Sequence, residues 1–287
     1  MYMIKEEYFE RIYNPIPEDL FVRYSDKLEG QPFYHTHNGY ELYFLVNGIV
    51  NYYIDQRCYR IDPGTIIAMK PGEYHRVEML DESIYKRFVI NISNRYLEAH
   101  STARTNLKDC FQKRFEDKPP VVVLSKEQAE ELLVLYNSLL DLKNSSEYGQ
   151  DVATSSYVML LLVKVNLLFF NNKDNPPMPN VMPPLVDKTI EYINEHLLDT
   201  FSLDELSEKL YYNGTYISRK FKAITGLSIQ QYILRKRIYL AQNYLSEGKS
   251  VTESGMLSGF GDYSNFSKIF KKNVGVSPKQ YQKRVLD

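Results

Sequence analysis

The C-terminal part of this chain contains one segment that occurs twice, 49 residues apart. Residues 216–222 read Tyr-Ile-Ser-Arg-Lys-Phe-Lys and align with residues 265–271, which read Asn-Phe-Ser-Lys-Ile-Phe-Lys. Residues 226–228 (Gly-Leu-Ser) align with residues 275–277 (Gly-Val-Ser) in the same register. A repeat of this length is usually one supersecondary unit used twice. It therefore constrains the fold of residues 202–281 more than any other feature of the sequence.

Helix signals recur in both copies and in the same order. A hydroxyl residue three positions before a carboxylate or amide is a capping box, Asn or Asp caps a helix start, and Gly ends a helix. The matching pairs are Ser202…Glu205 with Ser250…Glu253, Asn213 with Asp262, Gly226 with Gly275, and Ser228…Gln231 with Ser277…Gln280. Each copy is predicted to be a helix, a turn, a second helix, a stop and a new helix start. The repeat is therefore a duplicated helix-turn-helix, with one helix from Ser228 to about Glu247 between the copies.

The second helix of such a unit enters the major groove of double-stranded DNA, where side chains from its N-terminal part reach base edges. Hydroxyl, Arg and Lys side chains can donate hydrogen bonds there, and lysines beside the helix can contact phosphates. The predicted base contacts are Thr215, Tyr216, Ser218, Arg219, Tyr263, Ser264, Ser267 and Lys268. The predicted phosphate contacts are Lys220, Lys222, Lys271 and Lys272.

The charge distribution distinguishes a DNA-binding domain from a helical domain whose charges are only solvated. Residues 219–284 contain 13 Lys or Arg and only 3 Asp or Glu, whereas the whole chain has a net charge of −1. A local excess of this size is the electrostatic footprint of a polyanionic partner. It favours DNA.

The same residues resemble a known family. Residues 216–222, with residues 225–228, Tyr232, Arg237 and Ala241, are similar to the first half of an AraC/XylS-type DNA-binding domain. Residues 259–272, with residues 275–278 and Tyr281, are similar to the second half. The resemblance covers residues 185–287. It implies a transcription regulator that places two recognition helices in adjacent major grooves, with RNA polymerase as a further partner.

Composition limits the cellular setting. The first seven residues, Met-Tyr-Met-Ile-Lys-Glu-Glu, lack the pattern of a signal peptide. The most apolar stretch, residues 158–170, is interrupted by Lys164 and Asn166, and we expect it to be too short to cross a bilayer. Cys58 and Cys110 have no CxxC spacing, which suits free thiols in a reducing compartment. These features predict a cytoplasmic protein without a membrane partner.

The N-terminal part is predicted to be rich in β-strands. From residue 33 to about residue 93, short apolar stretches alternate with turn residues such as Asn47-Gly48, Asp62-Pro63-Gly64 and Pro71-Gly72. Strands at this spacing are typical of a sandwich or barrel. The expected fold class is therefore α+β, a β-barrel with two helices followed by an all-α domain of two helix-turn-helix units.

A second resemblance lies in this region. His35, His37 and Glu41, followed by Gly48, Gly64, Gly72 and His75, are similar to the two cupin motifs. The resemblance implies a small β-barrel with a pocket in its mouth, which AraC-type regulators commonly use to bind an effector.

Three interpretations of this constellation stay open. His35, His37, Glu41 and His75 can bind a divalent metal ion. Alternatively, they hydrogen-bond a small ligand, a sugar or related polyol, together with Arg23, Tyr24 and Tyr43, and no cofactor is needed. In the third interpretation these histidines are structural. A metal-dependent cupin enzyme is the rival function, but no acid, base or nucleophile constellation supports turnover, so we expect no catalytic residues and no enzyme.

The middle of the chain is predicted to hold two helices, one opened by the capping box Ser125…Gln128 and one over residues 152–169. By likeness to the family they supply a homodimer interface.

Residues 173–184 contain five prolines and form the expected linker. The expected domains are residues 1–172 for effector binding and dimerisation, residues 173–184 as linker and residues 185–287 for DNA. A sugar or another small ligand in the barrel would alter promoter binding; the alternative is a metal-binding cupin fused to a DNA-binding module.

Overall fold

A computed structural model describes residues 13–14, 19–26, 34–80, 85–112, 119–143, 145–171 and 178–286 of the chain. The chain divides into two compact units. One contains residues 14–30 and 36–181, and the other contains residues 1–13, 31–35 and 182–287. The boundary at residue 182 falls within the predicted linker, of which residues 173–177 lie outside the described part. The linker residues Asn180 and Val181 hydrogen-bond to the backbone of Cys58 and so belong to the β-rich unit.

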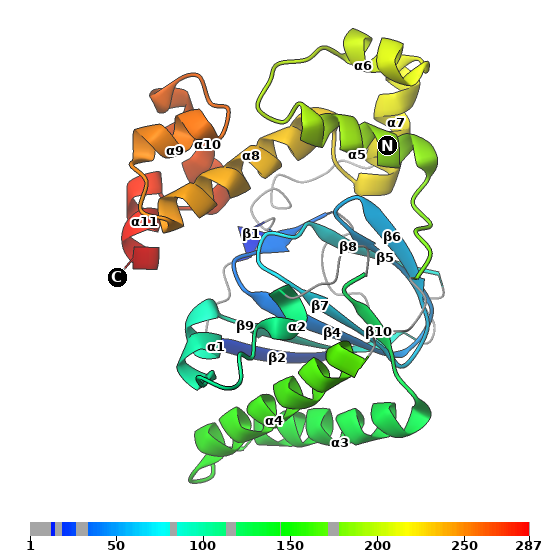
Figure 1. Ribbon diagram of the computed structural model, residues 1–287, viewed down its shortest axis with the longest axis vertical. Helices are drawn as coiled ribbons and strands as arrows, with labels where there is room; N and C mark the ends of the chain where they lie inside the picture. Colours follow the sequence, from blue (N-terminus) through cyan, green and yellow to red (C-terminus); the bar gives the residue numbers. More distant parts are fainter. Residues whose placement is uncertain are drawn as a thin grey trace. The chain divides into compact units, whose positions relative to one another are not determined.

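The β-rich unit is built from two main antiparallel sheets (Figure 1). One sheet has the strand order β10-β7-β4-β9-β2, the other has the order β6-β5-β8, and β1 pairs with β3 in a short third sheet. The strands are β1 (Tyr13–Asn14), β2 (Leu20–Ser25), β3 (Thr36–His37), β4 (Tyr40–Asn47), β5 (Val50–Ile54), β6 (Arg57–Ile61), β7 (Thr65–Met69), β8 (His75–Met79), β9 (Lys86–Ile92) and β10 (Val121–Val123).

Alternation along β4 explains how the larger sheet acquires two buried faces. Successive side chains of a strand point to opposite faces. Leu42 and Phe44 face one core cluster, whereas Tyr43 and Leu45 face another. The predicted turn after β4 forms at Gly48, whose φ is +95°, in the left-handed region that glycine adopts without strain. A Cβ there would also lie 3.2 Å from Cα of Tyr85.

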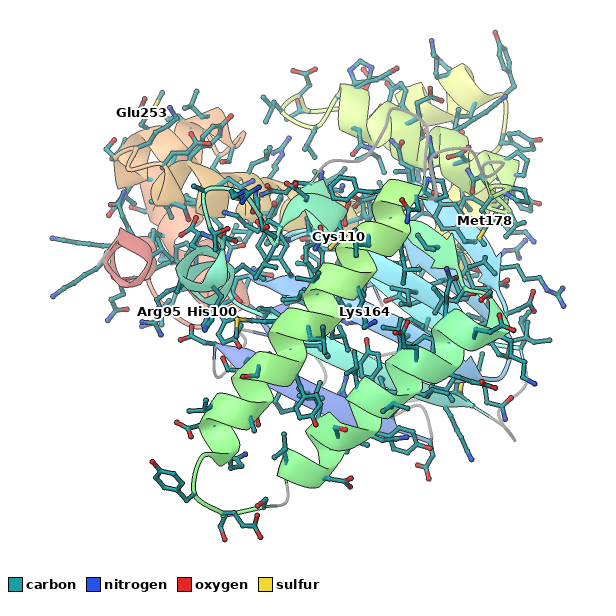
Figure 2. All side chains as sticks on the ribbon, turned by 60° about the horizontal axis from the view of Figure 1, so that its bottom comes forward. Arg95, His100, Cys110, Lys164, Met178 and Glu253 are labelled. Atoms are coloured by element: carbon teal, nitrogen blue, oxygen red, sulfur yellow. The ribbon has the colours of Figure 1, made fainter. Side chains whose placement is uncertain are left out.

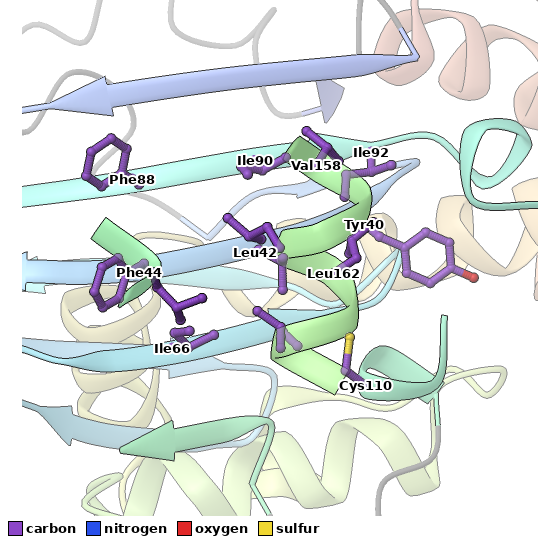
Figure 3. Close-up of a cluster of buried hydrophobic side chains, with 14 of the residues drawn as sticks. Tyr40, Leu42, Phe44, Ile66, Phe88, Ile90, Ile92, Cys110, Val158 and Leu162 are labelled. Atoms are coloured by element: carbon purple, nitrogen blue, oxygen red, sulfur yellow. The ribbon is translucent and has the colours of Figure 1, made fainter. Parts of the chain in front are cut away.

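Helices cover one face of the five-stranded sheet. They are α1 (Asn94–His100), α2 (Asp109–Gln112), α3 (Lys126–Lys143) and α4 (Gln150–Asn171). Figure 3 shows the core that joins them to the sheet, with Leu42, Phe44 and Ile90 from the strands near Val158 and Leu162 of α4. The two long helices were predicted from the sequence, and the reciprocal hydrogen bonds of the Ser125…Gln128 capping box are present. The elements α1, α2 and β10 were not predicted.

The length of α4 corrects one expectation. The helix has 22 residues, and an 18-residue window within it has a mean hydropathy of 1.7, so by length and composition it could cross a membrane. The apolar segment is longer than predicted because the helix starts at Gln150 and continues to Asn171. Five of its side chains are buried, including Val158, Leu161 and Val165, which pack in the core on the sheet. The other side of α4 is exposed.

The second unit contains seven helices among its described residues (Figure 1). They are α5 (Pro184–Glu195), α6 (Leu203–Leu210), α7 (Gly214–Thr225), α8 (Ile229–Ser246), α9 (Val251–Leu257), α10 (Tyr263–Val274) and α11 (Pro278–Leu286). The α+β fold class predicted from the sequence is confirmed, with a β-rich N-terminal region followed by a helical helix-turn-helix region.

The predicted helix ends form as hydrogen-bonded caps. Ser202 and Ser228 each form a complete capping box. Asn213 accepts hydrogen bonds from two backbone N–H groups at the start of α7, and Asp262 accepts one at the start of α10. Gly226 ends α7 with a φ of +73°. The repeat visible in the sequence therefore corresponds to a structural repeat, α6-α7 and α9-α10.

A short piece from the N-terminal part of the chain also belongs to the helical unit. Tyr34 is fully buried, and its ring packs edge-on against Tyr232. Its N–H donates to the carbonyl of Thr225 (3.3 Å), and Nη1 of Arg235 donates to its carbonyl oxygen (3.0 Å). No feature of the sequence predicted this packing.

Candidate functional site

Three ionisable side chains meet inside the β-rich unit. His37 lies on β3, Glu41 near the start of β4 and His75 at the start of β8. All three are buried, and their ligand atoms lie within 4.8 Å of one another. Nε2 of His37 is 3.0 Å from Oε2 of Glu41, and Nε2 of His75 is 3.8 Å from Oε1 of the same carboxylate. We call these three residues the His–Glu cluster.

Backbone carbonyl groups fix the two imidazole rings of the cluster. Nδ1 of His37 lies 2.8 Å from the carbonyl oxygen of Gly39, and Nδ1 of His75 lies 2.9 Å from that of Glu73. A carbonyl oxygen can only accept, so each Nδ1 carries a proton and donates it. Both Nε2 atoms then face Glu41. Because a neutral Nε2 is an acceptor, its approach to a carboxylate requires a proton or a cation between them.

The carboxylate of the cluster is also held from the neighbouring strand. Asn91 pairs with Glu41 in the register of β9 and β4, and its Nδ2 donates to Oε2 of Glu41 at 2.7 Å. Burial lowers the pKa of His75, and the nearby Glu41 carboxylate opposes this effect only in part. The neutral imidazole, which is the form that binds metals and accepts hydrogen bonds, is therefore favoured at His75.

The donor set of the cluster fits a divalent metal ion. Two imidazole nitrogens and a carboxylate are ligands for Zn²⁺, Fe²⁺ or Mn²⁺. The hydrogen bonds from both Nδ1 atoms are of the kind that orients metal-binding histidines. The same atoms can instead accept and donate hydrogen bonds to the hydroxyl groups of an organic ligand.

The other predicted effector residues lie in different places. Tyr43 is fully buried on the inner face of the larger sheet, in the same core as Tyr52 and Val89. Arg23 pairs with Val89 and lies on that inner face as well. Tyr24 lies on the opposite face, where its ring packs against Phe88, so the structure does not bring it to the cluster. His35 was expected as a fourth member of the site, but it belongs to the helical unit and is not part of the cluster.

Four inward-facing polar residues were missed by the sequence analysis: Tyr52, Tyr85, Arg87 and Asn91. Burial raises the pKa of the Tyr43 and Tyr52 hydroxyls well above its usual range, so both stay protonated. The pattern of β9 contained a signal, because alternation places Arg87 and Asn91 on the same face as the apolar Val89. Polar residues that share a face with buried apolar ones commonly have a function or a specific partner.

The two repeated helices, α7 and α10, form the candidate DNA interface. Ile217 and Phe221 of α7 are buried, and so are Phe266 and Phe270 of α10. This burial directs the opposite side of each helix outward. The predicted base-contacting residues on that side are exposed, apart from Ser218 and Ser267, which are half-buried. The four predicted phosphate-contacting lysines are exposed as well.

Positive charge concentrates around one aromatic ring at the start of α7. The ring of Tyr216 stacks with that of Tyr212, with centroids 6.0 Å apart. Cζ of Arg219 and Nζ of Lys220 lie 5.7 Å and 5.8 Å from the same ring centroid. These cation–π contacts hold two cations at the N-terminal half of the helix, where a recognition helix meets DNA.

Arg237 of the connecting helix α8 joins both halves of the helical unit. Its Nε and Nη2 donate to the carbonyl oxygens of Leu197 (2.7 Å) and Asp199 (2.8 Å), which follow α5. Its Nη1 donates to the carbonyl oxygen of Gly259 (2.9 Å), in the turn between α9 and α10. One guanidinium thereby links α8 to the segment that precedes the first helix-turn-helix unit and to the turn within the second.

Comparison with known proteins agrees with this architecture. A model of the AraC-like ligand binding domain matches residues 21–162, and a model of a helix-turn-helix domain matches residues 206–284. The probable transcriptional regulator LumQ of Photobacterium leiognathi is 33% identical over 128 residues, which cover 44% of this chain and 49% of LumQ. The HTH-type transcriptional activator RhaR of Enterobacter sp. (strain 638) is 23% identical over 251 residues, covering 87% of this chain and 86% of RhaR.

Among solved structures, ToxT of Vibrio cholerae is 17% identical, with a TM-score of 0.36 and coverage of 92% of this chain and 97% of ToxT. The chain spans about half the length of LumQ and of the regulatory protein PocR of Salmonella typhimurium. The fold and site define a protein with an N-terminal ligand-binding domain and a C-terminal duplicated helix-turn-helix. This chain belongs to the AraC family.

Proposed function

We propose that this protein is a cytoplasmic transcription regulator that binds double-stranded DNA through α7 and α10. The observation that carries the proposal is the repeated recognition helix, capped at Asn213 in one copy and at Asp262 in the other. Each copy buries its aromatic and aliphatic side and exposes hydroxyl and cationic side chains. No catalytic role is proposed, and RNA polymerase stays a predicted partner.

A pair of neighbouring variants tests the DNA interface. Arg219→Ala should cost about 1–3 kcal/mol of binding to the preferred duplex and relax base choice at one position, because Arg219 is assigned to a base edge. Lys222→Ala should weaken binding to all duplexes alike and reduce the salt dependence, because Lys222 is assigned to a phosphate. Selection from randomised duplexes, followed by titrations at several salt concentrations, measures both effects. Equal losses with unchanged sequence preference in both variants would refute these assignments.

The proposed regulatory input is a small carbohydrate-like ligand in the interior of the β-rich unit. The His–Glu cluster, Asn91 and the buried tyrosine hydroxyls supply the paired donors and acceptors that hydroxyl groups need. A ligand that binds one state of the protein better shifts the protein toward that state and alters promoter occupancy. Thermal unfolding of the full chain with a panel of saccharides tests this, since a ligand that binds the folded state raises the unfolding midpoint.

A divalent metal ion is the second candidate ligand, favoured by the close approach of His37, Glu41 and His75. Metal analysis of the purified protein, before and after EDTA, should find stoichiometric metal if this candidate is correct. Loss of that metal in His75→Ala, with Asn51→Ala as a variant outside the cluster, would assign it to these residues. A metal-free protein whose unfolding midpoint does not respond to Zn²⁺, Fe²⁺ or Mn²⁺ would exclude this candidate.

We also propose a homodimer that associates through the exposed side of α4. Figure 2 shows α4 beside α3, with Lys164 labelled; its ammonium group forms an ion pair with Glu131 of α3. Apolar side chains repeat along the exposed side at helical spacing: Val152, Leu160, Val163 and Leu167. An exposed apolar stripe of this kind is typical of an interaction surface.

Light scattering after size-exclusion chromatography tests the dimer. Leu160→Glu combined with Leu167→Glu should produce a monomer, because buried carboxylates oppose association. Val123→Glu is the control, because Val123 is an exposed apolar residue of β10 outside the two helices, and this variant should stay dimeric. A wild-type monomer at micromolar concentration would contradict the proposal.

A further inference from the structure

A buried arginine lies in the interior of the β-rich unit without a carboxylate in ion-pair contact, although the buried Glu41 of the same interior acts on it electrostatically. Arg87 is on β9, opposite Leu45 of β4, and only 7% of its surface is exposed. It lies on the same strand face as Val89 and Asn91, which points between the two sheets rather than toward α3 and α4. An arginine stays charged in this environment.

Few groups satisfy this guanidinium. Nη1 donates to the hydroxyl oxygen of Tyr85 at 2.9 Å, and that oxygen lies 3.1 Å from the hydroxyl of Tyr43. Cζ lies 5.4 Å from the ring centroid of Tyr85 and 5.9 Å from that of Tyr43. Nε has no acceptor, and within the described part of the chain Arg87 forms no ion pair. A guanidinium has five N–H donors, and the hydroxyl of Tyr85 is the one acceptor that the described residues supply to Arg87.

A second buried arginine of the same unit shows how such a charge is ordinarily accommodated. Arg76 on β8 is 8% exposed, lies 4.8 Å above the ring of Tyr53 and forms an ion pair with Glu78 (3.2 Å). Arg87 has similar aromatic neighbours but no carboxylate in ion-pair contact among the described residues, and Glu41 acts on it only at longer range. Because a buried charge without a partner destabilises the folded state, its presence indicates that an anion binds there.

Polar side chains connect Arg87 with the His–Glu cluster. The ring of His75 stacks with that of Tyr52 at 6.3 Å, and Tyr52 packs against Tyr43 at 4.7 Å. Tyr43 meets the hydroxyl of Tyr85, which accepts the hydrogen bond from Arg87. The interior therefore presents a cation toward one end, phenolic hydroxyls in the middle, and imidazole and carboxylate groups toward the other end.

We propose that the effector is a hydroxylated carboxylic acid, such as a sugar acid, and that Arg87 binds its carboxylate. This inference rests on the proposed function, in which the same interior binds the ligand. A guanidinium pairs with a carboxylate through two parallel hydrogen bonds. A carboxylate is favoured over a phosphate because one guanidinium balances one negative charge, whereas a phosphate carries up to two. The hydroxyl groups of the ligand then face Tyr43, Tyr52 and the cluster.

The first test needs no ligand and compares two buried arginines. Arg87→Met should raise the unfolding midpoint of the full chain by roughly 2–4 °C, because it removes an unpaired buried charge and keeps the side-chain volume. Arg76→Met should lower the midpoint, because it breaks the ion pair with Glu78 and leaves that carboxylate only its hydrogen bonds from Asn51 and Tyr53. Differential scanning fluorimetry of both variants measures this difference in sign.

The second test compares acids with their neutral counterparts by calorimetric titration of the full chain. The probes are glucuronate with glucose, galacturonate with galactose, gluconate with glucitol, and glucose 6-phosphate as the phosphate arm. The wild type should bind an acid more tightly than its neutral counterpart. Arg87→Met should weaken that acid about 10- to 100-fold, the loss expected for a charge-assisted hydrogen bond. Arg87→Lys should restore part of it, and Arg76→Met should leave it unchanged.

Each failure has a separate meaning. Binding of neutral sugars without preference for the acids overturns the carboxylate proposal but leaves the proposed sugar response intact. Equal binding of an acid by the wild type and Arg87→Met also overturns it. Binding of the phosphate ester in place of the acids shows that the anion is a phosphate. If neither class binds the wild type, both proposals fail. If Arg87→Met does not fold, two results still test the proposal. They are the preference of the wild type for an acid over its neutral counterpart and the affinity of Arg87→Lys for that acid.

Discussion

Substitution of Arg237 tests how the two helix-turn-helix units of this chain are fixed relative to each other. Its three hydrogen bonds to backbone carbonyls link the segment after α5 and the turn before α10 to one helix. Removing the side chain by Arg237→Ala breaks all three. Each such bond contributes about 1 kcal/mol net. The side chain is only half-buried, so water can partly replace it at the carbonyls. We therefore expect a total loss of about 2–3 kcal/mol.

Two measurements follow for this variant. Urea unfolding of the full chain should show a lower midpoint for the transition of the helical unit. Binding to a duplex that carries both half-sites should weaken more than binding to either half-site alone, because the link between the subunits is looser. Arg237→Lys should recover about one of the three bonds, since an ammonium group cannot reach three separated carbonyls in the geometry of a guanidinium. Lys236→Ala is the neighbouring control.

A variant with unchanged stability would refute the reasoning, because three hydrogen bonds would then contribute nothing. Equal weakening on full sites and half-sites would show that Arg237 acts on one subunit only.

Three further predictions concern the stability of the folded chain. Asp262→Ala removes the cap that accepts from the N–H of Asn265 at 2.6 Å and should cost about 1 kcal/mol, measured by urea unfolding against Glu208→Ala at an exposed residue of α6. Phe266→Ala deletes a fully buried ring and should cost about 3–5 kcal/mol; a loss below 1 kcal/mol would contradict its place in the core. Burial raises the pKa of the Cys58 thiol to about 12, so the thiolate is scarce and Ellman's reagent at pH 8 should react far faster in denaturant than in the folded protein. The folded state binds the thiol proton of Cys58 more strongly than the unfolded state does. The protonated thiol therefore contributes fully to stability below about pH 9, and this contribution is lost as the pH rises toward 12.

The sequence alone determined the helical unit almost completely. Its signals act over three or four residues, and they hold wherever the segment lies in the fold. The capping boxes at Ser202 and Ser228 and the glycine stop at Gly226 all form where the sequence placed them. The i, i+4 spacing of Ile217 and Phe221 likewise matches the buried side of α7, which leaves the predicted DNA contacts on the side that faces outward.

The β-rich unit was predicted less well, because strand faces and partners depend on residues far apart in the chain. Short apolar stretches bounded by turn residues predicted the strands around the Asn47-Gly48 turn. They did not give the three-residue strand β10, which pairs with β7 across more than fifty positions. Nor did they separate Tyr24 from Tyr43, because the face that a residue takes follows from the register of β2 on β9.

The sequence by itself thus determined the duplicated helix-turn-helix, because helix caps and helical periodicity act over a few residues. It pointed to His37, Glu41 and His75 only through the likeness to the cupin motifs, together with His35, which is not part of the cluster. Only the tertiary structure decided that Asn91 donates to the carboxylate of Glu41, that Tyr34 is buried in the helical unit and that Arg87 has no carboxylate in ion-pair contact. Each of these depends on contacts between residues separated by tens to hundreds of positions. A composition or a periodicity does not record such contacts, because they arise when the sheets and helices pack.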